Sequence, residues 1–498
     1  MRRALAPAVS LIIGMIAAQL FFTFFVKASN TYLYNNLIAM QQAGYHLLVP
    51  NTLVMPTLQE WAPAVYGGLF FTLTVGAGLS LMGWFGVYLW RIFPRLRWII
   101  AGSLLLFSGY VLINLNSPGV NLPITFICML IPAISGFVAL QFYAGLCISG
   151  NFRIPVVHMA VIVMIGMIWM PKVNADVFTT IRDSLLLTNP TGQKINDFYY
   201  KYTLYPAEAF KSLDQKQLKT VNIKIPDNGL SQRIESRLLK EDYFPVAATH
   251  PADIVVIQEN NRILFQNNGR TVHISTISEF FASPSDHLTT VSQKSDYYHF
   301  FRKMTFIGLI AASPLICYMI LHTVLTILLF PIPSVVMRSG CAATACLLAT
   351  GIAALPLYID ASPPAPSEIS RYLESDRWQD RVSALKCISN DDIPIDGLNE
   401  LFRLVDSPWT AERYWLAKSL SNSRSPKTGQ LALILLNDPQ PNVECMALFS
   451  LGNRNQPAAI PEIQRKMASS DHWYVQWYGY KALKRLGWKQ QIGQEQPK

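Results

Sequence analysis

Two histidines inside apolar stretches are the residues of this 498-residue chain best placed to do chemistry. No Asp, Glu, Lys or Arg shares those stretches with His158 and His322. An ionisable side chain inside a membrane raises a functional question, and paired imidazoles could ligate a haem iron or relay protons. Measured from the same side, however, His158 lies about 6 Å deep and His322 about 12–15 Å deep, at 1.5 Å per residue. This difference favours imidazoles that are hydrogen-bonded to neighbouring helices over a shared ligand.

The polar parts of the chain show no spacing typical of a catalytic or metal site. His250, His273, His287 and His299 are scattered without ligand spacing. HExxH, GxSxG, P-loop and dinucleotide-binding patterns are absent, and none of the seven cysteines belongs to a CxxC motif. We therefore predict no catalytic residue, no cofactor and no metal ligand. A cleft that joined His287, His299 and Asp296 would instead indicate an enzyme.

The composition indicates that the apolar stretches around His158 and His322 are membrane spans. Hydrophobic residues make up 51% of the chain and charged residues 14%, whereas about 25% of the residues of an ordinary soluble protein are charged. A bilayer is crossed by about 17–25 mainly apolar residues, so we predict a multi-pass α-helical membrane protein with about seven spans. The predicted spans are Leu5–Val26, Ala64–Leu89, Trp98–Leu115, Ile124–Leu146, Ile154–Met170, Thr305–Phe330 and Ser339–Ile359.

The first span has two interpretations. Arg2 and Arg3, an apolar run and Val-Lys-Ala before Ser29 are similar to a signal peptide with its cleavage site. The run is roughly 22 residues long and exceeds the usual core of about 7–15, which favours an uncleaved anchor.

The net charge of +10 favours one orientation of the spans. Most of the excess lies in short loops, whereas nucleic-acid binding needs a basic patch on a folded domain. We therefore predict no nucleic-acid partner and place the N-terminus in the cytoplasm of a bacterium, with the protein in the inner membrane. An odd number of spans then puts 171–303 and 360–498, and so the C-terminus, outside the cytoplasm. The predicted cytoplasmic loops contain Arg2, Arg3, Arg91, Arg95, Arg97, Arg153 and Arg338.

Residues 171–303 predict a small α+β domain tethered at both ends. The spacing of Phe198, Tyr202 and Tyr205 predicts a helix with an aromatic face, which is usually core or a membrane interface. TVNIKIP alternates like a half-buried strand. The pattern of residues 253–275 predicts three short strands, which are connected by turns at two asparagine-rich sites.

The last quarter of the chain repeats itself. Its segments begin at aspartates 30, 32 and 33 residues apart, namely Asp376, Asp406, Asp438 and Asp471. A period near 32 predicts a solenoid. The aspartate would cap a helix, a small residue would let the neighbouring helix approach, and an apolar residue would be buried against the next repeat. The small residues are Ala384, Ala417, Ala447 and Gly479, and the apolar residues are Ile388, Leu420, Leu451 and Leu483.

The order Asp, Val, Ala, Ala-Leu and Leu-Gly resembles the HEAT-like repeats of phycobilisome-lyase-type proteins. Val475, Gly479 and Leu486 match this pattern well, whereas the second copy has Arg413 in place of Val. The resemblance implies an α-solenoid used as an interaction surface, without lyase activity. The predicted order is five spans in 1–170, the α+β domain in 171–303, two spans in 304–360, a proline-rich hinge in 361–367, HEAT-like repeats in 368–489 and a polar tail in 490–498.

Aromatic residues crowd these repeats, and WYVQWYGY points its rings around a whole helix. Exposed Trp and Tyr are typical anchors of protein interfaces. We predict a protein partner here, with packing on the loop domain or the membrane surface as the other interpretation. The predicted contact residues are Trp409, Tyr414, Trp473, Trp477 and Tyr478.

These features favour a non-enzymatic scaffold embedded in the lipid bilayer, which docks a protein during assembly of an envelope complex. The alternative is a transporter or permease subunit, since Pro132, Pro155 and Pro314 could break helices around a substrate path. A polar-lined passage between the spans would favour that alternative. A membrane enzyme acting on lipid or glycan is the second alternative.

Overall fold

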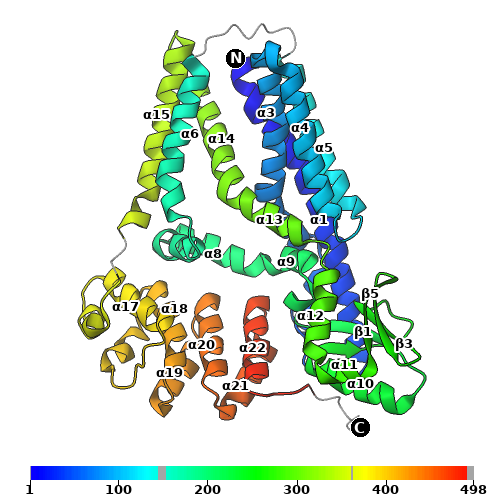
Figure 1. The fold of residues 1–498 in the computed structure, drawn as a ribbon. Coiled ribbons are helices and arrows are strands. Elements are labelled where there is room, and N and C mark those ends of the chain that lie inside the picture. The colour runs from blue at the N-terminus through cyan, green and yellow to red at the C-terminus, as the bar shows by residue number, and fades with distance from the viewer. Residues whose placement is uncertain (1, 144–152, 360–362, 491–498) are drawn as a thin grey trace.

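The computed structural model describes residues 2–143, 153–359 and 363–490. Helices predominate in these residues, and a single small sheet accompanies them (Figure 1). Parts of the predicted fourth span, hinge and tail lie outside the described residues.

Six helical stretches of the described chain are long and apolar enough to cross a membrane, and they correspond to all the predicted spans except the fifth. The first helix is longer than predicted. It continues past Val26 to Gln42 because neither proline nor glycine interrupts it there. The helices of these stretches are α1 (Arg2–Gln42), α2 (Trp61–Phe71) with α3 (Ala77–Ile92), α4 (Arg97–Asn116), α5 (Leu122–Tyr143), α13 (His299–Ile307) with α14 (Ser313–Leu328), and α15 (Val335–Ala354).

The predicted fifth span is helix α6 (Arg153–Trp169), which packs against α15 and runs along the bundle in Figure 1. The chain then bends by 101° into a second apolar segment that starts with α7 (Val177–Ile181). The bent pair counts as a seventh crossing if it is taken as one span.

A five-stranded sheet in the order β2-β1-β3-β4-β5 forms the centre of the loop domain. β1 pairs in parallel with β2 and β3, and β3, β4 and β5 form an antiparallel meander. The predicted turns are confirmed, because Asn260, Asn268 and Gly269 adopt positive φ angles of 54°, 48° and 74°. β2 was not predicted, since three residues are too few to show a pattern. The strands are β1 (Lys219–Lys224), β2 (Tyr243–Pro245), β3 (Ile254–Glu259), β4 (Arg262–Asn267) and β5 (Arg270–Thr276).

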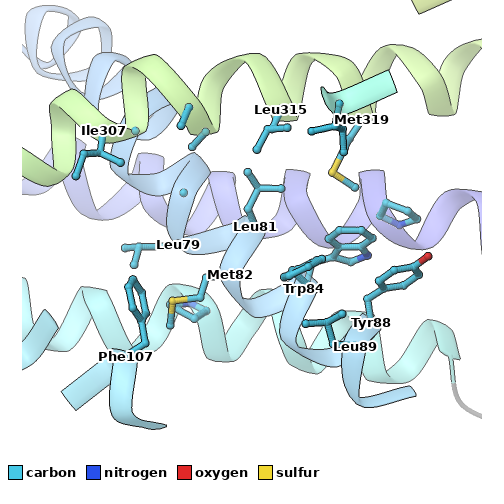
Figure 2. Close-up of a pocket in the computed structure, with 18 of the residues that line it drawn as sticks. Leu79, Leu81, Met82, Trp84, Tyr88, Leu89, Phe107, Ile307, Leu315 and Met319 are labelled. Atoms are coloured by element: carbon cyan, nitrogen blue, oxygen red, sulfur yellow. The ribbon is translucent and has the colours of Figure 1, made fainter. Parts of the chain in front are cut away.

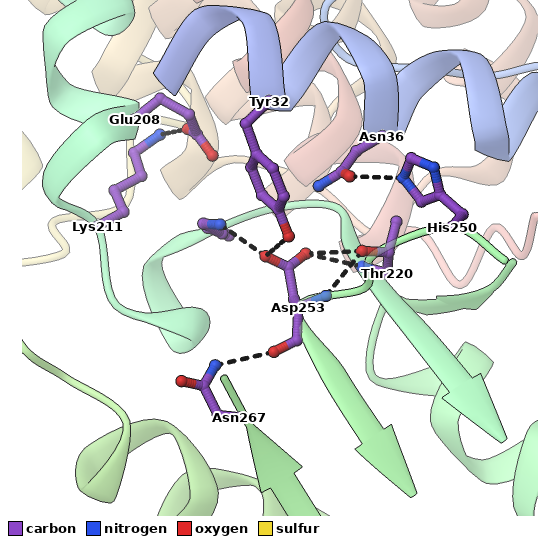
Figure 3. A network of polar contacts seen from close by, with 9 residues as sticks. Tyr32, Asn36, Glu208, Lys211, Thr220, His250, Asp253 and Asn267 are labelled. Carbon is purple, nitrogen blue, oxygen red and sulfur yellow. Dashed lines mark hydrogen bonds and ion pairs between the residues drawn. The ribbon is translucent and has the colours of Figure 1, made fainter. Parts of the chain in front are cut away.

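Helix α1 leaves the bundle and joins the loop domain through a buried polar network (Figure 3). Asp253 accepts hydrogen bonds from Lys216 Nζ at 2.8 Å and from the backbone N–H of Thr220 at 2.9 Å. Burial by itself raises the pKa of Asp253, but the charge of Lys216 and these hydrogen bonds outweigh it and hold the pKa below its ordinary value. On α1, Asn36 Oδ1 lies 2.9 Å from Nε2 of His250. The bundle and the loop domain therefore share one long helix.

The C-terminal module, residues 369–485, consists of helices joined by short turns. Four helices pack one against the next, and the residues that precede them are 32, 31 and 32 positions apart. The predicted apolar residues are buried, each eleven positions after the residue that precedes its helix. The four helices are α17 (Trp378–Asn390), α18 (Thr410–Ser419), α20 (Pro441–Asn453) and α22 (Trp473–Arg485), with α19 (Pro426–Leu435) and α21 (Ile460–Ser469) between them.

The predicted capping role of the aspartates is wrong. None of these four helices has a side-chain N-cap. Asp438 instead accepts a hydrogen bond from the N–H of Gln440 at 2.9 Å and pairs with Arg413 of α18 at 2.6 Å. Arg413 thus joins α18 to the turn before α20, and in this register Glu412 occupies the place that corresponds to Val443. Ala417 is also one position out of register, because Leu416 occupies the place that corresponds to Ala447.

Both large polar regions lie at the same end of the bundle, opposite the N-terminus (Figure 1). Helices α8 (Pro190–Tyr202) and α9 (Leu204–Phe210) run between the spans and the C-terminal module. Phe198 packs on Tyr66 of α2 at 5.4 Å, and Tyr200 packs on Tyr474 of α22 at 5.1 Å. Helix α8 therefore touches the bundle with one face and the module with the other.

Candidate functional site

The bundle divides into two groups of helices with a groove of about 1740 Å³ between them. Helices α6, α14 and α15 form one group, and α1, α3, α4 and α5 form the other. Helix α14 also packs on α1, so it belongs to the boundary between the two groups. In Figure 2, Leu315 and Met319 of α14 face Leu81 and Trp84 of α3. This volume exceeds the roughly 300–1,000 Å³ of ordinary small-molecule pockets.

The two groups meet closely where one π-helical turn crosses another. These turns are η2 (Thr72–Gly76), between α2 and α3, and η7 (Gly308–Ala312), between α13 and α14. A methyl group on Gly308 would stand 2.6 Å from the carbonyl oxygen of Thr74, so glycine permits this approach. The Ser313 hydroxyl also donates to a backbone carbonyl of the first turn at 2.6 Å. Thr74 and Gly308 of this crossing line the groove.

The groove has uncharged, mainly apolar walls. Among the described residues that line it there is no Asp, Glu, Lys or Arg. Leu105 and Met159, on its two sides, expose 74% and 64% of their surfaces, so the groove opens at the outer surface of the helix bundle. The polar-lined passage that would favour a transporter or permease is not formed by these residues.

His158 and His322 both line this groove, and their ring centroids are 4.4 Å apart. The prediction that they lie at different depths is wrong. Helix α14 ends at Leu328, since Pro331 and Pro333 follow. His322 is therefore about 9 Å from the end of its helix, and His158 is about 8 Å from the start of α6, at 1.5 Å per residue. The two imidazoles lie side by side.

The two imidazoles form a polar cluster with a tyrosine and a serine. We call it the histidine cluster, and its members are His158, Tyr318, His322 and Ser339. Nδ1 of His158 lies 2.8 Å from the Tyr318 hydroxyl, and Nε2 of His322 lies 3.2 Å from Oγ of Ser339. In the described part of the chain, the second nitrogen of each ring has no hydrogen-bond partner. The cluster therefore retains hydrogen-bonding capacity beside the groove. No group of three or more His, Cys, Asp or Glu among the described residues could hold a metal ion.

The five aromatic residues predicted to bind a partner lie against the protein's own chain. Trp473 is buried and packs on Tyr205 of α9 at 5.0 Å. The guanidinium of Arg182 lies 3.6 Å from the centre of the Tyr414 ring. These contacts are the internal packing that the sequence left open as the other interpretation, and binding of a partner stays a prediction. The remaining contacts pair Trp409 with Trp378, and Trp477 with Tyr478 and Lys481.

A buried carboxylate that the sequence analysis did not single out joins the module to the membrane side. Asp183 lies in the π-helical turn η5 (Arg182–Leu186) that follows α7. It accepts hydrogen bonds from Nη2 of Arg182 at 2.6 Å and from Nε1 of Trp415 at 2.7 Å, and Lys386 Nζ lies 3.3 Å away. We call this contact the Asp183 junction. An Arg-Asp pair in a sequence is common and does not indicate which distant indole it meets.

The cleft that would have indicated an enzyme is not formed by the residues named for it. His287 lies 2.7 Å from a ring nitrogen of His273. The Asp296 carboxylate binds Arg302 at 2.5 and 2.9 Å, with the His299 ring 3.9 Å away. These contacts belong to two separate pairs.

Comparisons with known proteins do not show a family. No family model, no curated protein and no solved structure matches the chain. The geometry of the groove and of the module therefore carries the functional argument.

Proposed function

We propose that this protein is a transporter or permease subunit that takes up a lipid-soluble molecule in the groove between its two groups of spans. One observation carries the proposal, which is the apolar groove of about 1740 Å³ that opens at the outer surface of the helix bundle. A water-soluble substrate needs polar walls to replace its hydration. A lipid-soluble substrate instead enters from the bilayer and is recognised by apolar contacts.

The crossing of the two π-helical turns at Gly308 supports this proposal. Many transporters work by rocking one helical group against another around a fixed site. Here the groups approach each other through glycine and π-helical turns, and π-helical turns are frequent at functional sites. A change in the angle between the groups would change access to the groove.

Filling the groove tests this function. An alkane that carries a photoreactive diazirine is added to the full chain in lipid nanodiscs, and the labelled peptides are located by mass spectrometry. We expect labelling on α3 and α14, and a severalfold loss of labelling in Leu315→Trp. The matched control is Leu348→Trp, because Leu348 is 62% exposed on α15 outside the groove. Equal labelling of both variants would contradict the proposal.

The second candidate is a scaffold in a bacterial inner membrane, with the N-terminus cytoplasmic and an extracytoplasmic module of HEAT-like repeats. Two observations favour it: the helices start at regular intervals of 32, 31 and 32 residues, and the module is attached at the Asp183 junction. A firmly held stack of helices presents the same surface to a partner throughout. An outward-facing residue for testing this is Ile434 of α19, which is 56% exposed.

A photoreactive amino acid at position 434 tests the scaffold in intact membranes. We expect a crosslink to one other protein, and none from the same amino acid at Leu348. Sidedness is measured with Arg95→Cys and Lys427→Cys. Arg95 lies in the turn between α3 and α4, whereas Lys427 lies in α19 of the C-terminal module. A membrane-impermeant maleimide added to spheroplasts should label position 427 and spare position 95. The reverse result would overturn the orientation.

A further inference from the structure

We infer that the histidine cluster receives the head group of an uncharged amphiphile whose head offers a hydroxyl or carbonyl oxygen. The inference rests on the proposed binding of a lipid-soluble molecule, and it names the class of ligand. It joins two features of the described chain: an apolar groove, and the polar side chains of the cluster that line it.

The free atoms of the cluster suit such a head group. His158 and His322 each have one ring nitrogen engaged, with Tyr318 and Ser339 respectively. The other nitrogen of a neutral imidazole either donates or accepts, and a phenol hydroxyl does both. A hydroxyl on the ligand could satisfy either arrangement, and a carbonyl could accept from an N–H or an O–H. The cluster therefore offers hydrogen bonds without offering a charge.

Charge excludes an ionised head group from this position. A phosphate or carboxylate moved into apolar surroundings needs a positive partner, and the described lining residues include no Lys or Arg. The guanidinium of Arg338, one residue before Ser339, donates to the carbonyl of Ile332 at 2.7 Å and lies over the Phe330 ring. Two imidazolium rings 4.4 Å apart would also repel each other strongly in an apolar medium.

The remaining groove suits an apolar tail. His322 lies fourteen residues after Gly308 of the crossing, which is about 21 Å along the turn and helix α14 at 1.5 Å per residue. This is about two thirds of the roughly 30 Å hydrocarbon core of a bilayer. Leu315 and Met319 lie along this path. A long alkyl or isoprenoid chain would therefore remain in contact with apolar side chains.

Competition between matched probes tests the head group. The full chain in nanodiscs is labelled with a hexadecanol that carries a diazirine in its tail. Unlabelled hexadecanol, an alkyl benzoquinone and hexadecyl phosphate then compete. We expect the alcohol or the quinone to compete at least tenfold better than the phosphate, and the better of the two shows whether the oxygen is a hydroxyl or a carbonyl.

Variants of the cluster test where the head group lies. We expect His158→Phe, His322→Phe and Tyr318→Phe each to weaken labelling about three- to tenfold, as loss of one hydrogen bond does. Tyr66→Phe is the matched control, because Tyr66 lies on α2 outside the groove. Thermal melts identify any variant that does not fold, and the other two substitutions then carry the test.

Two results would overturn the inference, and they differ in their meaning. The head-group assignment is wrong if hexadecyl phosphate competes as strongly as hexadecanol, or if all folded cluster variants are fully labelled. Binding in the groove would still stand. Absence of labelling on α3 and α14 with every probe removes the proposed function together with the inference.

Discussion

The indole Nε1–H of Trp415 donates a 2.7 Å hydrogen bond to Oδ2 of Asp183. Trp415 belongs to the second long helix of the C-terminal module, and Asp183 belongs to the segment that leaves the membrane bundle after α6. Both residues are buried. This bond therefore couples the module to the bundle, although the two residues are far apart in the sequence.

Removing this donor should loosen the module. Trp415→Phe keeps an aromatic ring but takes a hydrogen bond from a buried carboxylate, which costs about 1.5–3 kcal/mol. We expect a lower melting temperature and faster proteolysis of the module. Trp409→Phe, which replaces a half-buried tryptophan stacked on Trp378, serves as the control. Equal effects of the two substitutions would show that the Asp183 junction does not hold the module.

The crossing of the two π-helical turns should not tolerate a methyl group at position 308. A Cβ on Gly308 would lie 2.6 Å from a backbone oxygen, whereas a Cβ on Gly340 would meet nothing within 4 Å. Overpacking typically costs about 1–3 kcal/mol. Gly308→Ala should therefore lower the melting temperature in detergent, and Gly340→Ala should leave it unchanged or raise it. A Gly308→Ala protein as stable as the parent would refute the close approach of the two groups.

Two arginines with ion pairs of similar length should contribute differently to the stability of the fold. Arg413 is mostly buried and reaches Asp438 in the turn before α20 at 2.6 Å, whereas Arg465 is exposed and pairs with Glu462 of its own helix at 2.5 Å. Breaking a buried pair costs about 3–5 kcal/mol, and an exposed pair contributes about 0–1 kcal/mol. Arg413→Val should thus destabilise the protein to chemical denaturation, and Arg465→Val should have little effect. Similar losses would show that Arg413 does not join the repeats.

Acid should weaken the module through His472. Burial lowers the pKa of this imidazole to about 4, and the charge of Asp471 opposes the shift only in part. The unfolded chain, with a pKa of about 6.5, binds the proton first, so stability is lost as the pH falls from about 6.5 toward 4. The loss reaches at most about 3 kcal/mol, at 1.36 kcal/mol per pKa unit.

Melting curves from pH 7.5 to 4.5 measure this effect. His472→Gln should show a shallower fall in melting temperature than the parent chain. His299→Gln is the control, since its side chain is 61% exposed. Parallel curves for the parent and His472→Gln would remove His472 as the cause.

The local features of this fold were predictable from the sequence because they depend on neighbouring residues. Apolar length predicted seven spans, and six of them are long apolar helices in the described chain. The asparagines at 260 and 268 indicated turns, since they accept positive φ more readily than most residues. The repeat period predicted the regular helix starts of the module. The register within one repeat was missed at Ala417, because neighbouring segments differ in length by one or two residues.

By itself, the sequence determined which segments are apolar enough for lipid, where the sheet turns, and the period of the C-terminal helices. The tertiary structure alone decided that His158 meets His322, that Trp415 reaches Asp183, and that the spans divide around a groove. Such contacts depend on where helices end, bend and cross. Small shifts at these points, such as the end of α14 at Leu328 or the bend after α6, add up over a helix and decide which distant side chains meet.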